Sequence, residues 1–363
     1  MKICFVGGAQ SIHTKRWVTW FTKHGHDVHL ISVDNTKIDD VKVHKIGDER
    51  KRGGILNYIR KLVQTRKLLR EIQPDILHAH YVFGYGTFAA FTNFHPFILS
   101  AWGSDIAIDP DKSKINLKLT KYTIKKADLI HTWDEFGKKR LKSLGADEKK
   151  IFLLYHGLDT NNFSPKAFSK DLRKKFDQNN TKIIISARPL TNKYNVELII
   201  EAASYIIKKS KNVKFVIIGD GVLRNNLEQR CQDLGISSYF NFVGKIPYKE
   251  MPKYLATADL FVDTSSDFRK NGCINRGGSG IGLTNLEAMS CGAITILPDR
   301  ISIIESEYNG IIYKQLDIDD LANKIIIGLN NKKGDLRDFV LKKADLEKNM
   351  KIWEKIYGDM EIK

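Results

Sequence analysis

The chain has 363 residues, 42% hydrophobic and 28% charged, a composition typical of folded globular proteins rather than disordered chains. At roughly 150 residues per domain, this length predicts two domains. Lys and Arg number 59 against 42 Asp and Glu, so the net charge is +17, which favours an anionic partner: nucleic acid, an acidic membrane surface or a phosphorylated substrate. The four cysteines form no CxxC pair, which disfavours a structural zinc site and indicates a reducing cytoplasm.

We expect neither a signal peptide nor a membrane span. The first apolar run, Ile3 to Val6, is too short for the hydrophobic region of a signal peptide. No charged side chain lies between Asp75 and Asp105, but Asn93 and Pro96 interrupt this stretch. A buried helix followed by a buried strand is therefore the better interpretation.

Short apolar strands alternate with helical segments in the first half of the chain. The first strand, 2–6, is followed by Gly7-Gly8, a helix at 13–24 and a second strand at 28–33. Further strands are expected at 75–78, 97–101, 129–132 and 151–154, and a basic helix at 55–72. This alternation is typical of βαβ units with a parallel sheet.

The same rhythm restarts after a polar segment, 159–180, which we interpret as an inter-domain linker. Strands are expected at 182–186, 214–218, 239–243, 260–263 and 293–297, and an amphipathic helix at 346–357. We therefore predict an α/β fold of two Rossmann-like, doubly wound domains, 1–164 and 165–345, facing each other across a deep cleft. The C-terminal helix, about 346–363, is expected to pack back on the first domain. Such folds bind ligands at the carboxyl ends of their strands.

Arg188 and Lys193 lie on the loop between an expected strand and helix. Their spacing lets both cations converge on one anion, because a guanidinium forks around two phosphate oxygens and an ammonium adds a point charge. A solvated basic loop explains the same spacing.

A loop of small residues precedes the helix that contains Glu287. Small residues let the backbone approach a ligand closely, and free amides at a helix start favour phosphate. Glu287 can accept hydrogen bonds from two neighbouring hydroxyls, as in a ribose diol. A tight turn with a solvated Glu287 is the alternative. The loop reads Ser279, Gly280, Ile281, Gly282, Leu283, Thr284.

Taken in order, these motifs resemble those of the family 4 glycosyltransferases. The set comprises Arg188-x4-Lys193, Gly219-Asp220-Gly221, Phe242-Val243-Gly244 and Gly280-x-Gly282-x4-Glu287. In the first half, Gly7-Gly8 and Tyr155-His156-Gly157-Leu158-Asp159 also agree with the family. The resemblance spans nearly the whole chain and implies the two-domain GT-B fold.

The resemblance implies retaining transfer of a hexosyl or N-acetylhexosaminyl group from a UDP- or GDP-sugar, without a metal or other cofactor. The implied acceptor is a saccharide or a lipid-linked molecule in bacterial surface polysaccharide, lipopolysaccharide or glycolipid synthesis. Arg188 and Lys193 match the diphosphate-binding pair, and Glu287 matches the carboxylate that binds the ribose. The other implied donor contacts are the small-residue loop 279–284 and Gly8, Gly219, Val243 and Gly244.

Three residues depart from the family pattern. Ser279 stands where the family usually has a Glu that contacts the donor sugar, Tyr194 where it has Gly, and Trp102 where it often has His. The donor sugar is therefore open. A catalytically impaired sugar-nucleotide-binding relative and a sugar-nucleotide epimerase of the same fold remain alternatives.

Polar and aromatic residues of the first half are candidates for the acceptor side. Trp102 either stacks on a sugar ring or is buried at a strand end, and Asp105 either binds an acceptor hydroxyl or caps the following turn. His78 and His80 share one side of a strand, but no third ligand has suitable spacing, so no metal site is expected. The other candidates for acceptor binding are His13, Arg16, His80 and His131.

The basic segment 50–72 is a candidate for contact with an anionic membrane at the inner face of the cell membrane. An apolar stripe accompanies its charges, formed by Ile55, Ile59, Leu62, Val63, Leu69 and Ile72. The alternative is that the stripe packs on the sheet while the charges face water. Nucleic-acid binding is disfavoured because the charge is dispersed and no recognised module is present. A nicotinamide enzyme is disfavoured because GxGxxG is missing after the first strand.

Overall fold

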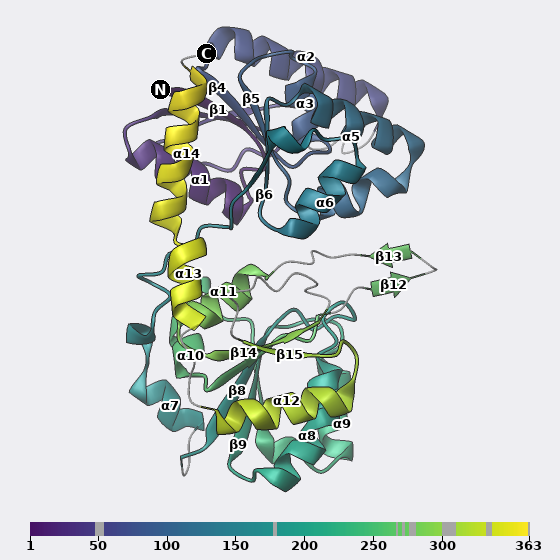
Figure 1. The fold of residues 1–363 in the computed structure, drawn as a ribbon, viewed down its shortest axis with the longest axis vertical. Coiled ribbons are helices and arrows are strands. Elements are labelled where there is room, and N and C mark those ends of the chain that lie inside the picture. The colour runs from purple at the N-terminus through teal and green to yellow at the C-terminus, as the bar shows by residue number, and fades with distance from the viewer. Residues whose placement is uncertain are drawn as a thin grey trace. The chain divides into compact units, whose positions relative to one another are not determined.

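The computed structural model describes residues 1–47, 54–176, 180–265, 268–270, 273–275, 281–299, 310–331 and 336–361. The chain forms two compact units, Met1–Tyr155 with Lys348–Lys363, and His156–Glu347 (Figure 1). The change of unit falls at 155/156, where the sequence analysis placed it at 164/165. Each unit is built on a parallel sheet, in agreement with the predicted α/β class.

The first unit contains a seven-stranded sheet with the strand order β3-β2-β1-β4-β5-β6-β7. Six of its strands were predicted to within two residues at each end. The missed strand, β3, lies at the edge, and its exposed, charged residues carry no apolar run. The strands are β1 Lys2–Val6, β2 Asp27–Ser32, β3 Lys42–Lys45, β4 Ile76–His80, β5 Phe97–Ser100, β6 Leu129–Thr132 and β7 Ile151–Leu153.

Helices cover both faces of this sheet, and several begin at a side-chain cap. Ser11, Ser113 and Asp134 each accept a hydrogen bond from a backbone amide of the first helical turn, which explains where α1, α5 and α6 start. The helices are α1 Ile12–Lys23, α2 Ile55–Ile72, α3 Tyr85–Ala90, α4 Ser104–Ala107, α5 Lys114–Lys126, α6 Glu135–Ser143 and α14 Leu346–Glu361. Short 3₁₀ helices lie at η1 Asp109–Lys112 and η2 Glu148–Lys150.

The C-terminal helix α14 packs on the first unit beside α1 (Figure 1). Trp353 and Tyr357 are both buried to 1% exposure or less. The Trp353 ring lies 5.0 Å from that of Trp17, and Tyr357 stacks on Phe21 at 4.9 Å between ring centroids. Large aromatic surfaces therefore join the two ends of this unit's sequence.

Helix α2 does not bury the single apolar stripe that the sequence suggested. Leu69 and Ile72 are buried and pack on the core, but Ile55, Ile59 and Val63 are 76%, 49% and 63% exposed. The alternative in which the stripe packs on the sheet is therefore wrong for the N-terminal half of the helix, where the apolar residues face solvent. The basic residues at positions 50–52 lie outside the described residues.

The second unit contains a six-stranded sheet with the order β10-β9-β8-β11-β14-β15. Its strands are β8 Lys182–Ala187, β9 Val213–Ile218, β10 Phe240–Gly244, β11 Leu260–Val262, β14 Ile294–Pro298 and β15 Ile311–Tyr313. A separate antiparallel ribbon pairs β12 Phe268–Lys270 with β13 Cys273–Asn275. The sequence analysis predicted every strand of the main sheet except the edge strand β15.

The segment 159–180 is not the plain linker that its polarity predicted. It contains η3 Pro165–Ala167 and α7 Lys170–Phe176, and its Phe163 and Phe176 are buried. Two aromatic anchors among polar residues were too few to produce a periodic signal. The unit's other helices are α8 Glu197–Lys209, η4 Ser237–Tyr239, α9 Arg224–Asp233, η5 Tyr248–Glu250, α10 Met251–Thr257, α11 Leu283–Ser290, α12 Ile318–Asn330 and α13 Leu336–Lys343.

Candidate functional site

Arg188 directly follows β8, at the carboxyl edge of the second sheet. Its Nη2 donates to Oδ2 of Asp263 at 2.8 Å and to Oδ1 of Asn285 at 3.0 Å. The Arg188 side chain is 12% exposed, and its buried Nε has no hydrogen-bond partner among the described residues. One nitrogen of the guanidinium is thus anchored while another donor is held unsatisfied, an arrangement that suits an anion.

Asp263, which follows β11, is fully buried, and both of its carboxylate oxygens accept hydrogen bonds from neighbouring donors. Besides Arg188, its Oδ2 accepts from Nδ2 of Asn285 at 2.9 Å. Its Oδ1 accepts from the backbone amide of Ser265 at 2.9 Å and from the Ser265 hydroxyl. A carboxylate occupied in this way fixes the guanidinium. The sequence analysis missed both Asp263 and Asn285.

Lys193 and Arg188 approach the same aromatic ring. Nζ of Lys193 lies 5.4 Å from the centroid of the Tyr194 ring, and Cζ of Arg188 lies 5.8 Å from it. Both distances are within the range of cation–π attraction. The structure thus brings the two predicted cations to one ring, that of Tyr194, which departs from the family pattern.

Glycine is found where the loop after β9 passes close to the backbone of Arg188. A Cβ at Gly219, whose φ is +130°, would lie 2.1 Å from the Arg188 carbonyl oxygen, so only glycine fits there. The Gly219 amide donates to the Gly244 carbonyl at 2.9 Å, which joins the ends of β9 and β10. Val243 is half-buried beside Gly244.

The small-residue loop leads into α11, which begins next to the guanidinium of Arg188. Gly282 is the N-cap of α11, and a Cβ there would lie 3.6 Å from Nη2 of Arg188. Ile281 is buried, and Leu283 and Thr284 are half-buried in the first turn. Ser279 and Gly280 lie outside the described residues.

Glu287 lies on α11 and is only 3% exposed. Its Oε1 accepts a 2.6 Å hydrogen bond from the hydroxyl of Tyr248, which is 40% exposed. The solvated alternative for Glu287 is therefore wrong. Tyr248, which the sequence analysis did not identify, holds this carboxylate in place.

At the carboxyl edge of the first sheet, His13, His80 and Trp102 form a cluster of rings. The Trp102 ring lies 4.8 Å from that of His13 and 5.2 Å from that of His80. Burial lowers the pKa of His13 to about 4 and that of His80 to about 3, so both rings are neutral at pH 7. Nδ1 of His80 lies 3.3 Å from the Thr14 hydroxyl, and its buried Nε2 has no hydrogen-bond partner in the described chain.

His131 belongs to a buried chain of hydrogen bonds in which both of its nitrogens are used. Nε2 lies 2.9 Å from the Leu154 carbonyl, so it carries the proton, and Nδ1 accepts from the Ser100 hydroxyl at 2.9 Å. Ser100 then accepts from Nε2 of His78 at 2.7 Å, and Nδ1 of His78 accepts from the Tyr357 hydroxyl. Burial lowers the pKa of His131 to about 4, consistent with these neutral tautomers.

Asp105 faces its own backbone. It is fully buried, and its carboxylate accepts from the amides of Val82 at 2.7 Å and Trp102 at 3.0 Å. Burial raises its pKa to about 6. Both amides precede Asp105, and α4, with Gly103 as its N-cap, has no side-chain cap, so the carboxylate joins the loops after β4 and β5 and the capping alternative is wrong. Arg16 is half-buried on α1, where its charge helps to lower the pKa of His13.

Gly8 lies just after β1, at a position where its own unit leaves room for a larger residue. A Cβ there would meet nothing closer than the Tyr85 hydroxyl at 3.7 Å. Across the described ranges, no group of three or more His, Cys, Asp or Glu side chains could hold a metal ion. Within the same residues, no helix combines the length and apolar character needed to cross a membrane.

Two family models match the chain, one in each unit. The model described as glycosyl transferase 4-like matches residues 2–133, and the model described as glycosyl transferases group 1 matches residues 168–346. Among solved structures, HepE of Anabaena in complex with UDP aligns with a TM-score of 0.78 at 17% identity, covering 99% of this chain and 100% of HepE. The lipopolysaccharide outer core galactosyltransferase WaaB aligns with a TM-score of 0.71 at 18% identity, covering 98% of this chain and 100% of WaaB.

Curated relatives match over shorter stretches. The chain is 28% identical over 164 residues to the alpha-monoglucosyldiacylglycerol synthase of Streptococcus pneumoniae, which is 44% of this chain and 34% of the relative. It is 27% identical over 194 residues to the UDP-Gal:alpha-D-GlcNAc-diphosphoundecaprenol alpha-1,3-galactosyltransferase of Escherichia coli, which is 51% of this chain and 47% of the relative. The matched region thus spans between about a third and a half of these relatives.

The two parallel-sheet α/β units and their structural neighbours place the molecule in the GT-B class of glycosyltransferases, as the sequence predicted. With a family model matched in each unit, the chain belongs to the family 4 type of these glycosyltransferases, which confirms the predicted family.

Proposed function

We propose that the protein is a retaining glycosyltransferase that moves a hexosyl or N-acetylhexosaminyl group from a UDP- or GDP-sugar to a saccharide or lipid-linked acceptor. No metal ion takes part, and the product belongs to a bacterial cell-surface glycan. The names of the relatives support both donor types, since one uses UDP-Gal and another is GDP-mannose-dependent.

The observation that supports this proposal most directly is the guanidinium of Arg188, in which one nitrogen is hydrogen-bonded within the described chain and another is not. Asp263 and Asn285 fix one nitrogen, and the buried Nε has no partner among the described residues. A buried, unsatisfied donor is costly unless a ligand completes it. A diphosphate supplies the required oxygens, and Lys193, which shares the Tyr194 ring, adds a second charge.

This arrangement suits departure of a nucleoside diphosphate. Negative charge grows on the leaving phosphate in the transition state, and donors already in place stabilise it without reorganisation. Arg188, Lys193 and the backbone amides that begin α11 are such donors in this proposal. Glu287, oriented by Tyr248, binds the ribose hydroxyls. The neutral rings of His13, His80 and Trp102 suit sugar hydroxyls and a sugar face rather than phosphate.

A donor panel tests the proposal directly. UDP-, GDP- and ADP-sugars are added to the protein with EDTA, and bound donors are detected as a rise in melting temperature. Mass spectrometry of acceptor panels detects transfer, and NMR of the product assigns the anomeric configuration. Donor binding without transfer supports the impaired-relative alternative, and sugar interconversion without acceptor supports the epimerase alternative. Transfer that EDTA abolishes contradicts the metal-free proposal.

The matched variants are Arg188→Ala with Lys193→Ala, against Arg230→Ala with Lys253→Ala. The control pair removes the same charge from the same unit, where Arg230 binds Glu201 and Lys253 binds Glu250 on the surface. We expect the first pair to lose the donor-induced shift and to slow transfer at least about 10²–10³-fold. Wild-type transfer by this pair contradicts the site assignment.

We also propose that α2 docks on an anionic membrane surface. Its outward face carries exposed Ile55, Leu56, Ile59 and Val63, with Leu56 81% exposed, and continues into exposed Arg66 and Arg70. Apolar and basic side chains on one helix face are typical of interfacial helices. An acceptor anchored in lipid would then be met at the surface where it resides.

Vesicle flotation tests the docking. Ile59→Ser with Val63→Ser should reduce binding to vesicles that contain phosphatidylglycerol, whereas Ile327→Ser, an exposed apolar residue of α12, should not. Binding should fall as salt rises. Equal flotation of all variants contradicts docking through α2.

A further inference from the structure

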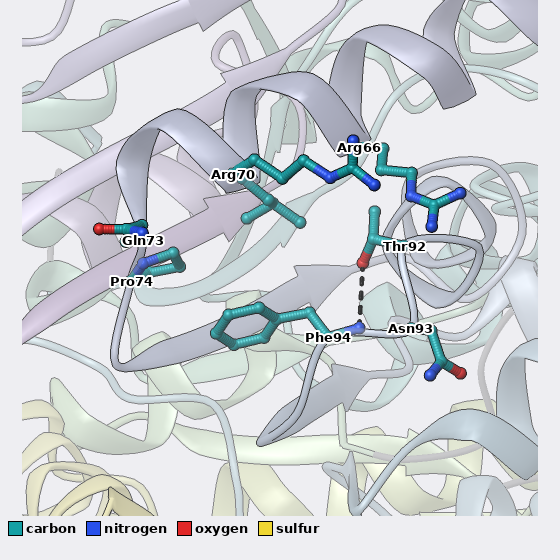
Figure 2. Close-up of a pocket in the computed structure, with 8 residues that line it drawn as sticks. Arg66, Arg70, Gln73, Pro74, Thr92, Asn93 and Phe94 are labelled. Carbon is teal, nitrogen blue, oxygen red and sulfur yellow. Dashed lines mark hydrogen bonds between the residues drawn. The ribbon is translucent and has the colours of Figure 1, made fainter.

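A pocket of about 440 Å³ lies in the first unit, at the amino edge of its sheet (Figure 2). The turn after α2 supplies Gln73 and Pro74 just before β4, and the turn after α3 supplies Thr92, Asn93 and Phe94 before β5. The ring cluster of His80 and Trp102 lies at the other ends of these strands, roughly 13–17 Å away along four or five residues. The pocket is therefore separate from the carboxyl edge.

Two arginines of α2 reach over this pocket, and no described carboxylate offsets their charge. Figure 2 shows Arg66 and Arg70 extending from one side of the helix above Thr92. Among the described residues, no carboxylate pairs with either guanidinium. Glu71, the acid beside them, pairs with Lys67 at 3.7 Å. Like charges four residues apart on a helix repel each other, so the pair is suited to an anion that bridges them.

The opposite wall adds donors and an apolar surface. Oδ1 of Asn93 accepts from Nζ of Lys126 at 2.6 Å, which leaves the Asn93 amide nitrogen to donate. Thr92 is occupied, because its hydroxyl donates to the Ala89 carbonyl at 2.6 Å and accepts from the Phe94 amide. Asp128, on the neighbouring turn, accepts from His95 and from the Phe97 amide. Leu69, Pro74 and Phe94 supply the apolar part.

We propose that this pocket is a second anion site, which binds a phosphate ester. Arg66 and Arg70 hold the phosphate oxygens, and Phe94 and Pro74 contact the organic part. The volume is within the range of small-molecule sites and exceeds what a bare phosphate needs. A phospholipid headgroup and a soluble phosphorylated metabolite share this chemistry, and the experiment separates them.

The experiment measures binding, so it is independent of the proposed transferase activity. The probes are inorganic phosphate, glycerol 1-phosphate and dihexanoyl phosphatidylglycerol below its critical micelle concentration, followed by NMR or calorimetry. Arg66→Ala with Arg70→Ala is compared with Arg60→Ala with Lys67→Ala, which removes the same charge from the same exposed helix outside the pocket. Thermal melting verifies that both pairs fold.

We expect a phosphate ester to bind more tightly than inorganic phosphate, and the pocket pair to lose at least about 10-fold in affinity while the control pair loses under about 3-fold. Preference for the phosphatidylglycerol probe identifies a lipid headgroup, and equal or better binding of glycerol 1-phosphate identifies a soluble ligand. Equal losses by the two pairs, or no binding of any probe, overturn the proposal. Unchanged flotation of the Ile59 and Val63 variant with intact probe binding contradicts only membrane docking through its apolar residues.

Discussion

The carboxyl edges of the two sheets carry opposite kinds of polar group. In the second unit, a charged network joins Arg188, Asp263 and Asn285, with no oxygen of Asp263 left idle. In the first unit, the same edge carries His13 and His80, whose pKa values lie well below neutrality. Two sheets of one architecture thus present a charged edge and a neutral edge.

The two edges differ in charge because their buried titratable groups have different neighbours. A buried charge persists only with a partner, and Asp263 gives Arg188 that partner. His80 is buried among the Trp17 and Trp102 rings and a threonine hydroxyl, and no described carboxylate pairs with it, so burial keeps the ring neutral. A fixed cation suits a phosphate, and uncharged donors and rings suit a sugar. The contrast therefore assigns donor and acceptor chemistry to different units in the proposed function.

Removing Asp263 is the strongest way to break this contrast. Asp263→Ala leaves Arg188, Asn285 and Ser265 without their shared acceptor, and breaking such a buried ion pair costs about 3–5 kcal/mol of unfolding free energy. Urea unfolding of the full chain, followed at two wavelengths, measures the loss. We also expect weaker binding of nucleoside diphosphate, because the guanidinium is no longer held.

Asp263→Asn separates charge from geometry. The amide keeps one acceptor oxygen for Arg188 and fills the same space, so it should recover part of the stability that alanine loses. It also removes a negative charge from the anion site, so the affinity for nucleoside diphosphate relative to nucleoside monophosphate should rise. Identical behaviour of the alanine and asparagine variants contradicts a positioning role for Asp263.

Acidification should convert the neutral edge of the first unit into a charged one. His80 and His131 have folded pKa values of about 3 and about 4, below the usual 6.5. The unfolded chain therefore takes up protons first, and stability that is complete above pH 6.5 is lost as the pH falls toward 4. Each such histidine contributes a slope of about 1.4 kcal/mol per pH unit.

Asp105 opposes this slope over part of the range, since burial raises its folded pKa to about 6 and protonation there favours the folded state. The matched variant is His80→Phe, which keeps a ring beside Trp17 and removes one titrating group. Urea unfolding between pH 7 and 4 should show its slope reduced by about one histidine. An unchanged slope contradicts the buried, neutral state of His80.

Much of the fold could be predicted because buried parallel strands are continuous apolar runs. β8 and β9 have little else in their sequences, and their ends were placed to within two residues. The edge strands β3 and β15 were missed because an edge strand is short and needs no such run. Which part of the α2 stripe is covered could not be predicted, since periodicity shows that a helix is amphipathic but not that its apolar face is covered.

In the candidate site, the cations were predictable and their partners were not. Arg188 and Lys193 belong to a motif on one loop, whereas Asp263 and Asn285 reach Arg188 from positions 75 and 97 residues away. Only the strand order β8-β11-β14 brings those segments side by side. The roles of Ser279 and Gly280 stay predictions, because both lie outside the described residues.

The smallest expected effect concerns Tyr248, whose hydroxyl donates a hydrogen bond to Oε1 of Glu287. Tyr248→Phe removes one hydrogen bond to the Glu287 carboxylate, worth about 1 kcal/mol, so nucleoside diphosphate should bind about 5-fold more weakly. If Glu287 binds the ribose hydroxyls, wild-type protein prefers the ribonucleotide to its 2′-deoxy counterpart, and the variant should lose part of that preference. Tyr254→Phe, on α10 with its ring 6.3 Å from that of Phe176, is the control. An undiminished preference in the Tyr248 variant means that Tyr248 does not orient Glu287 toward the ribose.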